Sequence, residues 1–118
     1  MPTSKRFRDK FKYSARLEEA NRVLCEYPGR LPVVVDVPET VRYKLEYKKY
    51  LVEKNMLLSS FSFMIRRNMD VPPESSLFFM CGNTIPRFND SMLTTYENYK
   101  GQDNFLVIEV REENTFGT

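Results

Sequence analysis

The stretch Leu31-Pro-Val-Val-Val-Asp-Val37 decides how this chain folds. Valine is branched at Cβ and favours extended backbone, so this run predicts a β-strand that ends before Pro38. Pro32 has no amide hydrogen to give to a neighbouring strand. We therefore expect Pro32 at the edge of a sheet or at the first position of the strand.

Three further segments predict strands, because apolar residues cluster in short runs between polar connections. They are Tyr50–Glu53, Leu77–Met80 and Phe105–Val110. Four helices are predicted from apolar residues that recur at helical spacing. Their apolar faces are Phe7 with Phe11; Leu17, Ala20, Leu24 and Tyr27, with Val23 beside them; Phe61, Met64, Ile65 and Met69; and Met92, Tyr96 and Tyr99.

Serine residues are the expected N-caps of three of these helices, because a serine side chain can accept a hydrogen bond from a first-turn amide. They are Ser14, then Ser59 or Ser60, then Ser91. The predicted order is helix, helix, strand, strand, helix, strand, helix, strand. This order indicates an α+β protein with a small mixed sheet.

The composition argues against an enzyme. The chain has 118 residues, enough for one domain, and contains no histidine. Without histidine there is no Ser-His or Cys-His nucleophile pair, and the commonest zinc ligand is missing. Cys25 and Cys81 form no CxxC pattern and are expected to be buried thiols. We therefore expect no metal and no cofactor, and no apolar stretch is long enough to span a bilayer.

The positive charge is concentrated at the N-terminus. Residues 1–30 carry eight basic and four acidic side chains, a net of +4, whereas the whole chain has a formal charge of only +2. Such a basic arm suits an acidic partner, which could be a protein face, an anionic lipid or RNA. A solvated basic helix is the alternative.

Six segments, in order, resemble the segments that mark one known family. They are Tyr27-Pro-Gly-Arg-Leu-Pro-Val-Val-Val35, Lys48-Lys-Tyr-Leu-Val52, Phe61-Ser-Phe-Met-Ile-Arg-Arg67, Leu77-Phe-Phe-Met80 with Asn83-Thr-Ile-Pro86, Asp103-Asn-Phe-Leu106, and Phe116-Gly117. The family is that of the autophagy-related ubiquitin-like modifiers (autophagy-related protein eight), which includes the light-chain-three and GABA-receptor-associated proteins. Because the motifs keep their register over nearly the whole chain, the chain is identified as a member.

The resemblance implies a ubiquitin-like β-grasp fold in which two additional N-terminal helices pack on a four-stranded mixed sheet. Within one structural domain we expect an N-terminal helical arm (1–28), a ubiquitin-like core (29–112) and a flexible C-terminal tail (113–118).

The resemblance also implies a modifier of autophagy. An autophagy cysteine protease would act at Phe116-Gly117-Thr118 and remove Thr118. E1-like activating and E2-like conjugating enzymes would then join the Gly117 carboxylate to phosphatidylethanolamine. Glycine has no Cβ, so this segment fits a narrow active site. The protein would be cytoplasmic, and bound to the autophagosome membrane once lipidated.

Family members bind the aromatic-x-x-aliphatic motifs of cargo receptors and adaptors by strand addition, and the resemblance assigns the matching positions. The pocket for the aromatic residue is assigned to Glu19, Val23, Pro32, Val34, Lys49, Leu51 and Phe105. The pocket for the aliphatic residue is assigned to Tyr50, Val52, Met56, Phe61 and Met64. Basic contacts to the acidic flanks of such peptides are assigned to Arg30, Lys48 and Arg67.

The alternation of side chains along the last strand predicts which face of the sheet Phe105 occupies. If Leu106, Ile108 and Val110 face the core, Phe105 faces the other side of the sheet. It could then line the pocket, or the N-terminal helices could cover it. Phe78 and Met80 match family positions linked to membrane contact, with burial in the sheet as the alternative.

Several residues depart from the family pattern and affect the expected peptide preference. Met56 and Met64 stand in place of leucine, and adaptable methionine side chains broaden the range of partners. Tyr47 and Asn68 each replace a basic residue, which weakens the preference for strongly acidic peptides. Glu53 stands where a proline is common.

Two other functions remain open at this stage. A scaffold that is never conjugated could bind peptides or tubulin through the basic arm, and it would tolerate replacement of Gly117. A nucleic-acid binder could use the basic residues with Phe7 or Phe11, and its affinity would depend steeply on salt. The small net charge and the lack of an RNA-reading motif argue against nucleic acid as a partner.

Overall fold

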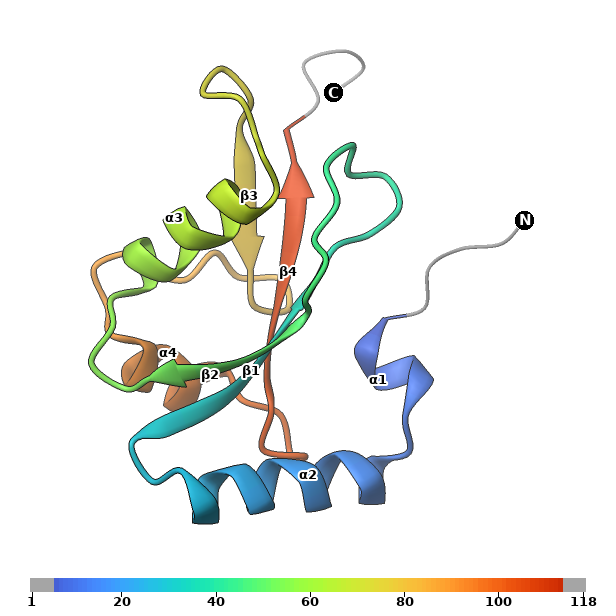
Figure 1. Cartoon of the computed structure of the whole chain (residues 1–118), viewed down its shortest axis with the longest axis vertical. Coiled ribbons are helices and arrows are strands. Elements are labelled where there is room, and N and C mark those ends of the chain that lie inside the picture. The colour runs from blue at the N-terminus through green and yellow to red at the C-terminus, as the bar shows by residue number, and fades with distance from the viewer. Residues whose placement is uncertain (1–5, 114–118) are drawn as a thin grey trace.

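The structure is a computed structural model that describes residues 6–113. A four-stranded sheet carries helices on both faces (Figure 1). The elements run α1 (Phe7–Lys10), α2 (Tyr13–Glu26), β1 (Arg30–Asp36), β2 (Lys49–Glu53), α3 (Leu58–Asn68), β3 (Leu77–Met80), α4 (Met92–Tyr99) and β4 (Leu106–Glu112). This is the predicted order of helices and strands. The predictions for Phe116, Gly117 and Thr118 lie outside the described residues.

The sheet is mixed, as predicted. Its strand order is β2-β1-β4-β3, so β1 and β4 are central while β2 and β3 form the two edges. β1 runs parallel to β4, and the two outer pairings, β1 with β2 and β3 with β4, are antiparallel.

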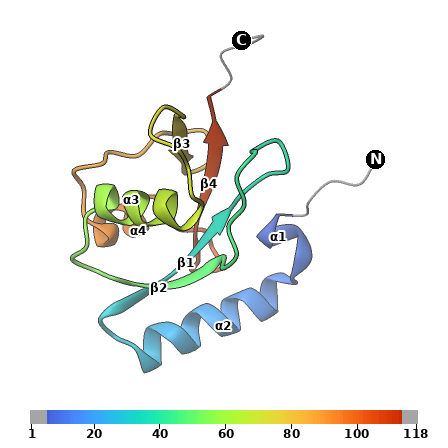
Figure 2. The same cartoon turned by 45° about the horizontal axis from the view of Figure 1, so that its top comes forward.

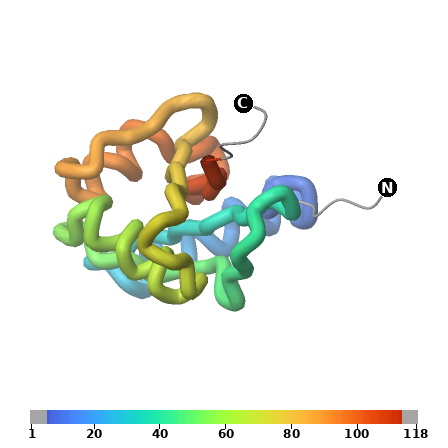
Figure 3. The backbone as a smooth tube through the Cα atoms, turned by 90° about the horizontal axis from the view of Figure 1, so that it is seen from above, coloured from blue at the N-terminus to red at the C-terminus, as the bar shows by residue number. Residues whose placement is uncertain are grey.

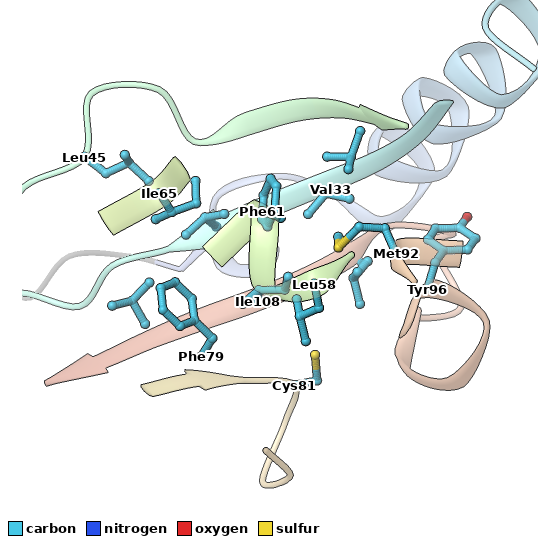
Figure 4. Close-up of a cluster of buried hydrophobic side chains, with 14 of the residues drawn as sticks. Val33, Leu45, Leu58, Phe61, Ile65, Phe79, Cys81, Met92, Tyr96 and Ile108 are labelled. Atoms are coloured by element: carbon cyan, nitrogen blue, oxygen red, sulfur yellow. The ribbon is translucent and has the colours of Figure 1, made fainter. Parts of the chain in front are cut away.

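The helices form a layer on each face of the sheet (Figure 2). Seen from above, α3 and α4 lie on one side of β4 and α1 lies on the other (Figure 3). The main core fills the space between the sheet and α3 and α4, where Phe61, Ile65 and Met92 pack on Val33 and Ile108 (Figure 4). A smaller cluster on the opposite face joins Phe7, Ala20, Val34 and Phe105.

The two-sided burial of β1 explains its run of valines. Leu31, Val33 and Val35 belong to the main core, whereas Val34 belongs to the smaller cluster. A strand that is covered on both faces needs apolar residues at successive positions, not only at every second one.

The position of Pro32 corrects the sequence prediction, since Pro32 is the second residue of a central strand. Its partner on β2 is Leu51, while the pairing of β1 with β4 begins only at Val33. The backbone nitrogen of Pro32 therefore faces β4 at a position where β4 has no paired residue. The missing amide hydrogen thus removes no hydrogen bond from the sheet.

Two of the three predicted serine N-caps are wrong. Helix α2 begins after Lys12 and α3 after Leu57, and neither has a side-chain cap. The carbonyls of Phe88 and Asp90 accept hydrogen bonds from the first amides of α3 and replace the cap. The prediction for Ser91 is confirmed, because its side chain accepts a hydrogen bond from the Thr94 amide at 3.1 Å.

Two expectations about buried side chains are also wrong. Val23 is buried against the sheet, whereas Tyr27 is exposed near the end of α2. The chain turns away after Glu26, so Tyr27 no longer follows the face of the helix. Cys81 is buried as expected, but Cys25 is exposed on α2.

Candidate functional site

Strand β2 has one side of its backbone unpaired within the described part of the chain. The Val35 amide donates to the Lys48 carbonyl at 2.8 Å, which marks these residues as a hydrogen-bonded pair. Bonded and non-bonded pairs alternate along antiparallel strands. The amides and carbonyls of Lys49 and Leu51 therefore point away from the sheet, and the Leu51 carbonyl accepts a hydrogen bond from the Arg30 guanidinium at 3.3 Å.

The residues predicted for the aromatic pocket lie together on one face of this edge. Pro32 is opposite Leu51, and Val34 is opposite Lys49, so these four side chains point to the same side. Helix α2 adds the remaining side chains of that face, Glu19 and Val23. Phe105 lies beneath them in the same cluster as Val34.

An ion pair joins two residues of the predicted aromatic pocket. The carboxylate of Glu19 pairs with the ammonium of Lys49 at 3.0 Å. The same ammonium lies 5.6 Å from the ring centroid of Phe7 and 5.2 Å from that of Phe11. Phe105 faces away from the main core, as strand alternation predicted, but it is only 2% exposed because Phe7 covers it.

The residues predicted for the aliphatic pocket lie on the other face of the same edge. Tyr50 and Val52 alternate with Lys49 and Leu51, so they point toward α3. The ring of Tyr50 stands edge-on to that of Phe61, with 5.6 Å between the centroids. Phe61 is buried, whereas Met56 and Met64 are partly buried and pack against the main core.

The three predicted basic residues are all exposed, and they make different contacts. Arg30 donates to the Leu51 carbonyl on the edge strand. Lys48 lines a cleft of about 520 Å³ between α1 and the segment that joins β1 to β2. Arg67 lies near the end of α3, with its guanidinium 6.0 Å from the ring centroid of Phe63.

A buried carboxylate that the sequence reasoning missed holds both N-terminal helices on the sheet. Asp103 accepts hydrogen bonds from the guanidiniums of Arg8 and Arg16 at 2.8–3.0 Å and from the Phe105 amide. Burial alone would raise the pKa of Asp103, but these hydrogen bonds lower it to about 2. Gly101 lies beside the pair, where a Cβ would come within 2.3 Å of the Arg8 guanidinium.

Two further acidic residues, on the central strands, hold the start of α1. The Phe7 amide donates to Asp36 at 3.2 Å, and Arg6 pairs with Glu109 at 3.1 Å. Asp36 and Glu109 are neighbours on the parallel strands β1 and β4. Burial raises the pKa of Asp36, with the nearby Glu109 charge adding to the effect. No local sequence pattern signals these contacts, because their partners lie far apart in the chain.

The described residues offer little catalytic chemistry. Burial raises the pKa of the Cys81 thiol to about 12, so this sulfur is protonated near neutral pH and is a poor nucleophile. Within residues 6–113 no three metal-binding side chains form a group that could hold an ion. None of the helices in that range has the length and apolar character required to cross a membrane.

The family and its members match almost the whole chain. The family described as "Autophagy protein Atg8 ubiquitin like" matches residues 15–117. Autophagy-related protein 8h of Arabidopsis thaliana is 34% identical, and the match covers 96% of each chain. Autophagy-related protein 8 of Schizosaccharomyces pombe is also 34% identical, over 95% of this chain and 93% of that protein.

Solved structures show the same fold. The crystal structure of Trypanosoma brucei ATG8 superposes with a TM-score of 0.82 at 25% identity, covering 97% of this chain and 99% of that one. Plasmodium falciparum Atg8, solved in complex with a Plasmodium falciparum Atg3 peptide, superposes with a TM-score of 0.85 at 26% identity. The match covers 94% of this chain and 98% of that one. The prediction of a ubiquitin-like fold with two additional N-terminal helices is confirmed. The chain belongs to the Atg8 family of ubiquitin-like autophagy proteins.

Proposed function

We propose that this chain is a modifier of autophagy that is joined through Gly117 to phosphatidylethanolamine and binds cargo receptors and adaptors along strand β2. Removal of Thr118 by a cysteine protease exposes the Gly117 carboxylate, which E1-like and E2-like enzymes then transfer. The lipid converts a cytoplasmic domain into one held on the autophagosome membrane.

One observation carries the peptide-binding part of the proposal. The two assigned side-chain sets lie on opposite faces of β2, and the unpaired backbone of Lys49 and Leu51 lies between them. In an added strand, residues separated by three positions point to opposite faces. The aromatic residue of an aromatic-x-x-aliphatic peptide would thus face α2 while its aliphatic residue faces α3.

The ion pair within the predicted aromatic pocket indicates which contact a peptide must replace. Lys49 pairs with Glu19 in the absence of a peptide. An acidic residue that precedes the peptide's aromatic residue can replace Glu19 as the partner of Lys49. The Atg3 peptide bound to the Plasmodium relative supports peptide binding by this fold, and an E2-like enzyme is one expected partner here.

The conjugation chemistry requires no catalytic group from this chain. The reactive cysteines belong to the protease and to the activating and conjugating enzymes, while this chain contributes a carboxylate on glycine. The high pKa of Cys81 and the absence of histidine agree with a non-enzymatic role.

A peptide titration tests the proposed site. A Trp-x-x-Leu peptide with acidic flanks is titrated by calorimetry into the wild type and Leu51→Ala, with Tyr47→Ala as the control. Leu51 borders the aromatic pocket, whereas Tyr47 is exposed and belongs to neither pocket. We expect weaker binding in Leu51→Ala alone. Equal affinity in all three proteins would exclude the assigned site.

A further inference from the structure

The open side of β2 extends beyond Leu51 to Glu53, the last residue of the strand. The Lys54 amide donates to the Gly29 carbonyl at 3.3 Å, which marks these two residues as a hydrogen-bonded pair at the end of the β1–β2 ladder. Glu53 comes just before that pair. Because bonded and non-bonded pairs alternate, the Glu53 amide points away from the sheet, as the amides of Lys49 and Leu51 do.

The hydrogen bonds of neighbouring residues agree with this direction. Arg30 lies opposite Glu53, but its amide donates to the Tyr27 carbonyl at 2.8 Å and not to β2. The Glu53 carbonyl accepts a hydrogen bond from the Met56 amide at 3.2 Å. Since this carbonyl is engaged in the turn that follows β2, the Glu53 amide is the last backbone group on the open side of the strand.

The two assigned pockets determine the direction in which a docked peptide runs. On β2, Lys49 and Leu51 belong to the aromatic pocket, whereas Tyr50 and Val52 belong to the aliphatic pocket, which is thus displaced toward the end of the strand. In a parallel strand, an aromatic residue beside Lys49 is followed three residues later by the residue beside Val52. An antiparallel strand with its aromatic residue beside Leu51 would place the aliphatic residue beside Lys48, outside the aliphatic pocket. The pockets therefore favour a parallel strand.

This parallel register brings the Glu53 amide to the peptide's aliphatic residue. In a parallel pair, a residue donates its amide to the residue before its neighbour and accepts at its carbonyl from the residue after its neighbour. The aliphatic residue beside Val52 would thus donate to the Leu51 carbonyl and accept from the Glu53 amide. The guanidinium of Arg30, which donates to the Leu51 carbonyl at 3.3 Å, is exposed and would be displaced by the peptide amide.

We propose that the Glu53 amide binds the carbonyl of the peptide's aliphatic residue and so fixes the register of the docked strand. This inference rests on the proposed function of β2 as a peptide site. The bond requires the aliphatic residue itself to be extended, because only then does its carbonyl face β2 while its side chain faces α3. A peptide that turns before this residue would lose the bond.

The same register identifies the residue that suits the next position of the partner. The residue after the aliphatic one lies beside Glu53, and its amide points away from β2 because backbone groups alternate in direction along an extended strand. Proline can therefore occupy this position without losing a hydrogen bond to β2. Proline also restricts the residue before it to extended backbone. The site thus suits partners that carry an aromatic-x-x-aliphatic-proline segment.

Calorimetry on two variants separates the amide of Glu53 from its side chain. Glu53→Pro removes the amide at an open sheet edge, where proline is tolerated, whereas Glu53→Ala keeps the amide and removes only the carboxylate. A single hydrogen bond has a modest net free energy, so we expect Glu53→Pro to bind a Trp-x-x-Leu peptide about threefold to tenfold more weakly than the wild type. Glu53→Ala should stay within about twofold. Equal affinity in all three proteins, or an equal loss in both variants, would overturn the proposal.

A pair of peptides tests the preference for proline. Trp-x-x-Leu-Pro and Trp-x-x-Leu-Gly, with the same acidic residues before the tryptophan, are titrated into the wild type. We expect the proline peptide to bind about twofold to fivefold more tightly, because it loses less conformational freedom on docking. Equal or weaker binding of the proline peptide would overturn this preference.

Amide hydrogen exchange of the wild-type chain tests the bond directly and separates it from the proposed function. Nuclear magnetic resonance follows the exchange of single amides with and without saturating Trp-x-x-Leu peptide. We expect exchange to slow at the amides of both Leu51 and Glu53. Slowing at Leu51 without slowing at Glu53 would overturn the inference and leave peptide addition to β2 intact. Exchange that slows at neither amide would overturn both.

Discussion

The ring of Phe7 lies edge-on against the ring of Phe105, with 4.8 Å between the ring centroids. Phe7 comes from the first helix and Phe105 from the residue before the last strand, so this contact closes the N-terminal arm onto the sheet. Helix α1 has only four residues, which is too short to be stable by itself. Its position therefore depends on the contacts of Phe7 and of the neighbouring arginines.

Replacing Phe7 should destabilise the protein. Phe7→Ala removes a buried aromatic side chain, and we expect the free energy of unfolding to fall by about 3 kcal/mol in urea denaturation. Phe11→Ala is the matched control, because Phe11 is 46% exposed whereas Phe7 is only 6% exposed. It should cost less than about 1 kcal/mol. Equal losses in the two variants would show that Phe7 is not the anchor of α1.

The contribution of Asp103 to stability should depend on pH. Hydrogen bonds from Arg8 and Arg16 hold its pKa at about 2 in the folded chain, below the ordinary 3.8. A carboxyl with a depressed folded-state pKa stabilises the fold above its unfolded pKa, and this stabilisation disappears as the pH falls through the folded value. The difference in unfolding free energy between the wild type and Asp103→Asn should thus be constant above about pH 5 and shrink between pH 3.8 and 2.

Urea titrations of both proteins across this pH range provide the measurement. Asp70→Asn is a suitable control, because Asp70 is exposed in the turn after α3. Its effect on the free energy of unfolding should be small throughout. If the difference for Asp103→Asn stayed the same from pH 7 down to pH 2, the charged state of Asp103 would not be what holds the helices.

Peptide spacing should matter, because the two pockets lie on opposite faces of β2. A peptide with two residues between its aromatic and aliphatic side chains can fill both pockets. A peptide with one residue between them places both side chains on the same face. We expect the second peptide to bind at least about tenfold more weakly by calorimetry, since one apolar side chain stays in water. Similar affinities would contradict addition of an extended strand.

Removing the charge of Glu19 should favour acidic peptides. In Glu19→Gln, Lys49 loses its partner and can pair with an acidic residue of the peptide without first breaking an ion pair. Because the pair is partly exposed, we expect affinity to rise only about twofold to fivefold at low salt and less at high salt. Glu18→Gln changes the neighbouring exposed charge and should have little effect. An equal gain in both variants would point to overall charge instead of Lys49.

The sequence predicted what depends on local pattern. The valines of β1, the apolar face of α3 around Phe61 and Ile65, and the cap at Ser91 all follow from side-chain chemistry within a few residues. The side-chain caps expected for α2 and α3 were wrong, and for α3 the structure shows the reason. At α3, the loop carbonyls of Phe88 and Asp90 take the place of a serine cap.

Contacts between distant segments were not predictable from one sequence. Arg8 and Asp103 are 95 residues apart, and nothing near either residue indicates the other. The alternation of β4 correctly placed Phe105 on the face opposite the main core. The alternation could not predict whether Phe105 would line a pocket or be covered by Phe7, because that depends on the position of α1 in the folded chain.

The attachment of lipid to Gly117 is tested most directly by intact mass spectrometry of the protein recovered from cells in which autophagy has been induced, with Gly117→Ala alongside. We predict a cytosolic form that lacks Thr118 and a membrane form heavier by one phosphatidylethanolamine, which the variant never acquires. Protein that keeps Thr118 and gains no lipid under these conditions would contradict the proposed function.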